Sequence, residues 1–133
     1  MTMADLFKKV GAPLKNTRWS WGAVSEKGDV FLRVWADERK QLDGRLTVRV
    51  THHAVFADQP ENLGYRERLE HVALIAAGAR SFCIQCTAKD TNAVPRALAS
   101  FDRRTLFVGG DLIDAGGDSW LELTERITIE ELK

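Results

Sequence analysis

The chain has 133 residues, of which 44% are hydrophobic and 29% charged, and it carries no formal net charge. This length fits one domain, residues 1–133, that can bury roughly two thirds of its unfolded surface. No apolar run approaches the roughly 18 residues that a membrane span requires, and the first ten residues lack the charged-then-apolar order of a secretory signal. We therefore expect a globular cytoplasmic domain that does not associate with membranes.

The charges are unevenly distributed along the chain. Lys and Arg outnumber Asp and Glu by ten to six in residues 1–53, and Asp and Glu outnumber Lys and Arg by thirteen to nine in residues 54–133. A zero net charge argues against a strongly basic nucleic-acid binder. The basic excess, however, lies in the part of the chain that holds three of the four tryptophans.

The first part of the chain predicts a short helix followed by strands. Residues 1–10 favour a helix, because Leu6, Phe7 and Val10 fall on one side of it. Strands are predicted at residues 17–24, 30–37 and 45–52. A glycine in the turn between the first two, Gly28, suits a hairpin.

The second part of the chain contains the clearest helix, at residues 64–77. Its predicted buried stripe has spacings of three and four residues and consists of Tyr65, Leu69, Val72 and Ala76. After it we expect a strand at 81–89, a short helical turn at 95–101, and a hairpin of strands at 105–113 and 119–127. The predicted fold class is α+β: about six strands in a curved, mostly antiparallel or mixed sheet, a partial barrel, with one main helix and short helical turns.

Aromatic and basic side chains share one face of the strand at 30–37. Because side chains alternate across a strand, Phe31, Arg33 and Trp35 point the same way. We expect a neighbouring strand to place Thr47, Arg49 and Thr51, which share a face by the same alternation, next to them. Such a face can stack on a base and contact phosphate. The alternative is that another element covers this face and buries its aromatic rings.

Two tryptophans two residues apart, Trp19 and Trp21, share a face by the same alternation. They form either an aromatic slot for a planar group or two anchors of the core. Three further arginines flank the predicted helical turn and are candidate phosphate contacts, unless they are ordinary surface residues: Arg96, Arg103 and Arg104.

The cysteine and histidine positions do not indicate a reaction. Cys83 and Cys86 lie three apart on a strand, hence on opposite faces, which favours two reduced structural thiols over a redox pair or a zinc site. His52 and His53 end a strand, and His71 is expected to be a solvated residue of the main helix. We assign no catalytic residue, no metal site and no cofactor from the sequence.

The stretch Arg18-Trp19-Ser20-Trp21-Gly22, together with Val30-Phe31-Leu32-Arg33-Val34-Trp35, resembles the PUA-like group that includes the EVE, ASCH and SRA domains. It also resembles the modification-reading N-terminal domains of HNH restriction nucleases. These families hold a flipped, often modified, base in an aromatic pocket. The resemblance implies pocket residues Trp19, Trp21 and Trp35, with base or backbone contacts from Arg18, Arg33 and Arg49.

The leading hypothesis is therefore a noncatalytic nucleic-acid-binding module, with modified DNA as a candidate ligand and any catalysis supplied by a separate effector protein. A second hypothesis is a small-molecule-binding protein or enzyme, in which Arg18 and His52 are among the polar groups of an enclosed cavity. A third is a protein-interaction domain that uses its tryptophan face.

Overall fold

Eight strands and three α-helices make up the fold of the computed structural model, which describes residues 1–132. The strands are β1 (Gly22–Val24), β2 (Val30–Trp35), β3 (Arg39–Leu42), β4 (Arg45–Arg49), β5 (Ser81–Ala88), β6 (Leu98–Phe101), β7 (Thr105–Ala115) and β8 (Asp118–Thr128). The helices are α1 (Met3–Lys9), α2 (His53–Phe56) and α3 (Leu63–Ala76), with 3₁₀ turns η1 (Ala36–Glu38) and η2 (Glu130–Leu132). No helix within residues 1–132 has both the length and the apolar character needed to cross a bilayer.

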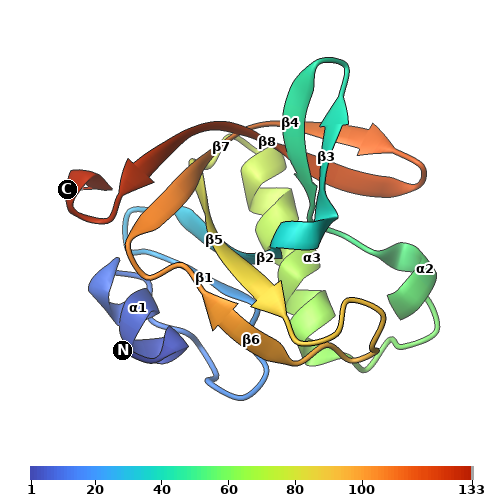
Figure 1. The fold of residues 1–133 in the computed structure, drawn as a ribbon, viewed down its shortest axis with the longest axis horizontal. Coiled ribbons are helices and arrows are strands. Elements are labelled where there is room, and N and C mark those ends of the chain that lie inside the picture. Colours follow the sequence, from blue (N-terminus) through green and yellow to red (C-terminus); the bar gives the residue numbers. More distant parts are fainter. Residues whose placement is uncertain (133) are drawn as a thin grey trace.

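The eight strands form one curved mixed sheet (Figure 1). Its order is β1-β2-β5-β7-β8-β4-β3, with β6 paired to β5. β2 and β5 are parallel, and every other strand pair is antiparallel. The outermost strands, β1 and β3, do not pair with each other, so the sheet does not close into a barrel. The predicted α+β class is confirmed.

Each face of the sheet is covered by a helix. On one face, Leu6 and Phe7 of α1 are fully buried in a cluster with Phe31 and Phe82, whose stacked rings lie 5.1 Å apart. On the other face, Ile75 of α3 packs with residues of strands from both halves of the sheet: Val30, Leu32, Val34, Val48, Val50, Cys83, Leu121 and Leu123. α3 therefore lies within the curve of the sheet.

The burial of Phe31 decides one of the alternatives left open by the sequence. Its side chain is 1% exposed and belongs to the core under α1. The expectation of an open face at Phe31 is therefore wrong, and the alternative of a covered face holds at this end of β2. Farther along the same strand, Arg33 and Trp35 remain partly exposed.

Two local predictions are wrong, and one strand was not predicted. Residues 17–21 do not extend β1, because the Ser20 N–H donates to the Asn16 carbonyl and the Asn16 side chain accepts from the Arg18 N–H, which makes a turn. Residues 98–101 form strand β6 on β5, not a helical turn. Strand β3 is polar and was not predicted, although Asp43 and Gly44, both with positive φ, join it to β4.

Polar residues occupy much of the buried face of α3. The predicted stripe is wrong at Leu69, which is 39% exposed, and at Ala76, which is also exposed, whereas Glu67, Arg68 and His71 are 6–7% exposed. The Glu67 carboxylate accepts hydrogen bonds from the Ser20 hydroxyl and the Trp21 N–H, both at 2.9 Å. This carboxylate thereby holds the turn that precedes β1 against the helix.

The Arg68 guanidinium contacts the backbone of three separate segments. It donates to the carbonyl oxygens of Val50 (3.1 Å) and Trp21 (3.2 Å) and to that of Arg33. Three strands separate β2 from β4 in the sheet order, so this side chain bridges the gap between the two sides of the curve.

Removing the Arg68 guanidinium is expected to destabilise the fold strongly. In Arg68→Met the three buried carbonyls lose donors from a charged group, which is expected to cost about 3 kcal/mol in the free energy of unfolding measured with urea. The control is Arg66→Ala, an exposed position on the same helix, where a change within about 0.5 kcal/mol is expected. A loss below about 1 kcal/mol in Arg68→Met would show that the bridge is not structural.

Candidate functional site

A cavity of about 400 Å³ opens between the sheet and the start of α3. Small-molecule sites occupy roughly 300–1,000 Å³, so this volume suffices for one small ligand. We call the cavity the aromatic pocket. Its rings belong to Trp21, Trp35, Phe56 and Tyr65, and its charged and polar groups include Arg33, Glu38, Arg49, His52, Arg68 and Arg96.

Three of the aromatic rings form a contiguous cluster. Phe56 of α2 stacks on Tyr65 of α3 at 4.6 Å, and the indole of Trp21 meets both rings edge-on, at 5.2 and 5.9 Å. Gly64 lies directly against the indole of Trp21, and an added Cβ there would overlap the ring. The absence of a side chain at this position therefore lets Trp21 lie against the first turn of α3.

The hydroxyl of Tyr65 is held at the end of β4. It accepts a hydrogen bond from the His52 N–H at 3.1 Å and lies 2.7 Å from Nδ1 of His53. Burial raises the pKa of Tyr65, so the phenol stays protonated at neutral pH. Burial and the nearby Arg49 lower the pKa of His52, so its ring is neutral at pH 7.

Two of the four arginines in the pocket have acidic partners. Arg49 donates to Glu38, with Nε at 2.9 Å from the carboxylate, and Arg96 donates to Asp37 at 2.7 Å. The guanidinium of Arg96 also lies 5.5 Å from the ring centre of Trp35. These pairs neutralise two of the charges in the pocket.

The other two arginines of the pocket, Arg33 and Arg68, make no ion pair within residues 1–132. The guanidinium of Arg33 makes a long contact, 3.4 Å, with the Ser20 carbonyl. Burial lowers the pKa of Arg68 to about 10, which leaves it protonated at neutral pH. The pocket thus combines aromatic rings with two cations that form no ion pair within residues 1–132, an arrangement that suits a flat ligand with negative charge.

The structure brings five of the candidate ligand residues together in this pocket: Trp21, Trp35, Arg33, Arg49 and Arg96. The strands that carry Arg33 and Arg49 were predicted to be neighbours, which is wrong. β2 and β4 are not neighbours in the sheet, and Arg33 and Arg49 line one cavity because the sheet curves back on itself.

The other four candidates lie elsewhere. Arg18 is exposed on the turn before β1 and lines neither of the two pockets described here. Arg103 stacks on Phe101 at 4.1 Å, and Arg104 is exposed beyond β6, so neither accompanies Arg96. Trp19 does not share a face with Trp21, because the segment is a turn and not a strand.

Sequence reasoning missed Phe56, Tyr65, Arg68 and Glu38 as pocket residues. The helical pattern did place Tyr65 on the buried side of its helix, but nothing in the pattern indicated that Arg68 shares that side. An arginine in a helix ordinarily predicts a solvated position. Phe56 lies in α2, a short helix between the strand predicted at 45–52 and the helix predicted at 64–77.

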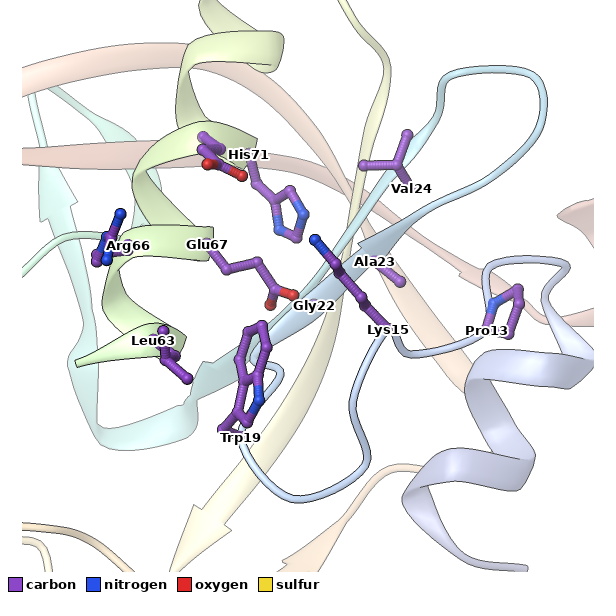
Figure 2. Close-up of a pocket in the computed structure, with 11 residues that line it drawn as sticks. Pro13, Lys15, Trp19, Gly22, Ala23, Val24, Leu63, Arg66, Glu67 and His71 are labelled. Atoms are coloured by element: carbon purple, nitrogen blue, oxygen red, sulfur yellow. The ribbon is translucent and has the colours of Figure 1, made fainter. Parts of the chain in front are cut away.

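A second cavity, of about 440 Å³, lies on the other side of the Ser20–Trp21 backbone and contains Trp19 (Figure 2). Figure 2 shows Glu67 and His71 pointing from α3 toward β1, with the indole of Trp19 near Glu67 and Lys15 approaching from the opposite wall. We call this cavity the second pocket.

His71 is a buried residue of the second pocket, contrary to the prediction of a solvated helical histidine. It is 7% exposed, and its Nδ1 atom is buried without a hydrogen-bond partner. Burial lowers the pKa of His71, and the attraction of Glu67 opposes this effect only in part.

The cysteines follow the strand alternation predicted for them. Cys83 packs in the cluster under α3 and Cys86 in the cluster under α1. Burial raises the pKa of both thiols, to about 12 for Cys83. Among residues 1–132, no group of three or more His, Cys, Asp and Glu side chains is arranged to hold a metal ion.

The buried imidazole predicts a stability that falls in mild acid. Because the pKa of His71 is lowered on folding, the unfolded chain takes up a proton near pH 6.5 and the folded chain does so only at lower pH. The free energy of unfolding should therefore decrease as the pH falls from 7 to 5. His52, shifted in the same direction, adds to this slope.

In His71→Gln, urea unfolding at pH 7, 6 and 5 should show a smaller decrease than in the wild type. His52→Gln provides the matched comparison for the second group. An identical pH slope in wild type and His71→Gln would contradict the assignment to His71.

Comparison with known proteins found no relative: the chain matches no protein-family model, no curated protein and no solved structure.

Proposed function

We propose that this protein is a noncatalytic nucleic-acid-binding module that holds one unstacked base in the aromatic pocket. The candidate ligand is DNA that carries a modified base, and a separate effector protein supplies any catalysis. The proposed compartment is the cytoplasm. The resemblance of residues 18–22 and 30–35 to PUA-like modified-base-binding domains supports the choice of ligand.

One observation carries the proposal: the uncompensated guanidinium of Arg33 lies in a cavity walled by aromatic rings. A nucleotide offers the complement of this arrangement, because its base is flat and its phosphate is anionic. Trp21 and Trp35 come from different segments of the chain, and a base that enters between them gains contact with both.

The polar groups of the pocket are suited to the edge of a base. Glu38 supplies a carboxylate acceptor, and the neutral ring of His52 supplies one donor and one acceptor. The Nδ1 atom of His52 lies 4.0 Å from a Glu38 oxygen, so the two groups are close enough to contact the same ligand. Arg96 is the proposed contact for a flanking phosphate, which would compete with its ion pair to Asp37.

A small anionic ligand that is not part of a polymer is the second candidate, since the pocket alone has sufficient volume. This hypothesis included Arg18 among the polar groups, but Arg18 lies outside the cavity. The two candidates differ in one respect: a polymer contacts several phosphates, so its affinity depends more steeply on salt than that of a free nucleotide.

The test is a titration of labelled oligonucleotides followed by fluorescence anisotropy. Single- and double-stranded DNA, each with and without a modified base, are compared with free nucleotides at 50 and 200 mM salt. For a single strand that makes about three phosphate contacts, affinity should fall roughly 20-fold between these salt concentrations. Absent or salt-independent binding of oligonucleotides would contradict the proposal, and tight binding of free nucleotides alone would support the second candidate.

Two substitutions locate the binding site. Arg33→Ala should weaken binding about tenfold and reduce the salt dependence by about one phosphate contact, and Trp21→Ala should weaken binding about tenfold through lost stacking. The matched control is Arg104→Ala, because Arg104 lines neither pocket. An equal loss in this control variant would show that binding occurs at another surface.

A further inference from the structure

We propose that the second pocket binds the nucleotide next to the one held in the aromatic pocket, and that it prefers a base with an exocyclic amino group. This inference rests on the proposed function, and it assigns a second site with its own specificity.

The two pockets lie on opposite sides of one partition. The partition consists of residues 19–22 and the first two turns of α3. Along the first segment, Trp19 lines the second pocket and Trp21 the aromatic pocket. Along α3, Tyr65 and Arg68 line the aromatic pocket, and the second pocket is lined by Leu63, Arg66, Glu67, Glu70 and His71. A strand that crosses the partition therefore meets an indole on each side.

The second pocket contains an imidazole that lacks partners inside the protein. His71 is more than nine-tenths buried, yet neither of its ring nitrogens makes a hydrogen bond within residues 1–132, and Nδ1 is fully enclosed. Its neighbour Glu67 is different, because both oxygens of that carboxylate already accept hydrogen bonds. Because Nδ1 is enclosed beside the Gly22 backbone, only Nε2 can face a ligand, and this atom can make one hydrogen bond to the edge of a base.

Charged side chains with no ion-pair partner surround this imidazole. Lys15 and Arg66 are exposed cations of the pocket wall, and neither makes an ion pair within residues 1–132. They can contact the phosphates on either side of a bound nucleotide. Glu70 is likewise unpaired there and supplies a carboxylate acceptor.

The carboxylate of Glu70 is the group that determines which base the second pocket prefers. A glutamate accepts a hydrogen bond from the amino group of cytosine, whereas thymine presents a carbonyl oxygen at the same position. Two acceptors facing each other repel, so cytosine should be favoured over thymine. The half-buried indole of Trp19 provides the stacking surface for either base.

The experiment uses labelled single-stranded DNA pentamers that share the central base. The bases on its 5′ and 3′ sides are varied in turn among cytosine, adenine, thymine and an abasic position. On one of the two sides the wild type should bind cytosine or adenine about tenfold more tightly than thymine. An abasic position there should weaken binding between about 5- and 150-fold, the range expected for loss of one stacked base.

Two variants identify the second pocket. Trp19→Ala should weaken binding about tenfold when the neighbour is cytosine and have no effect when the neighbour is abasic. Glu70→Gln changes an exposed side chain conservatively, keeps the fold, and should abolish the preference for cytosine over thymine. Arg104→Ala is the control, because Arg104 lines neither pocket, and circular dichroism checks that every variant is folded.

The outcomes separate the two proposals. Wild-type binding that requires Trp21 and Arg33, but is unchanged in Trp19→Ala and Glu70→Gln, overturns the second site and leaves the proposed function standing. If the wild type binds no pentamer, both proposals are overturned. If Trp19→Ala does not fold, the base preference in Glu70→Gln decides the question alone.

Discussion

A single buried guanidinium connects the parts of this fold that the sheet leaves apart. The sheet is open between β1 and β3, and Arg68 donates hydrogen bonds across the space between β2 and the end of β4. Desolvation of a buried charge is costly, and here three backbone carbonyl oxygens offset that cost. Because the same carbonyls belong to Trp21, Arg33 and Val50, the positions of three segments that line the aromatic pocket depend on this one side chain.

The helix that carries Arg68 also determines that there are two pockets. Glu67 and Arg68 are adjacent in sequence and bind the segment before β1 from two directions, through its N–H and hydroxyl groups and through a carbonyl. That segment is consequently fixed against α3 and separates Trp19 from Trp21. The polar buried face of α3 is therefore the structural basis of both candidate sites.

Some elements could be predicted correctly from the sequence, because their apolar residues repeat with the period of a strand or a helix. The hairpin of β7 and β8, strand β5 and the extent of α3 follow from apolar patterns and turn residues, and the α+β class follows from them. The pattern could not indicate which side of α3 is buried, because Leu69 is exposed while Arg68 and His71 are enclosed. Hydrophobicity predicts burial only where hydrogen bonds do not compensate for the burial of polar groups.

The candidate site was predictable in composition but not in geometry. The sequence indicated four of the residues that line the cavity, because strand alternation puts aromatic and basic side chains on shared faces: Trp21, Trp35, Arg33 and Arg49. These side chains lie together because the sheet is curved, so that strands that are not adjacent approach each other. Local sequence patterns do not predict this curvature. Trp19 was misplaced for a local reason, since the Asn16 side chain accepts a hydrogen bond from the Arg18 N–H and makes a turn where strand alternation was assumed.

The position of β7 and β8 in the middle of the sheet has a consequence for the order of folding. β4 pairs with β8 across 71 to 75 residues of sequence, as in the pairs Arg49–Trp120 and Thr47–Glu122, and β3 pairs with β4 alone. Residues 39–49 therefore have no sheet to join until the C-terminal hairpin exists. Non-local pairing of this kind slows folding, because loop closure must precede the contacts that stabilise it. During synthesis the β3–β4 hairpin emerges from the ribosome long before its partner strand β8.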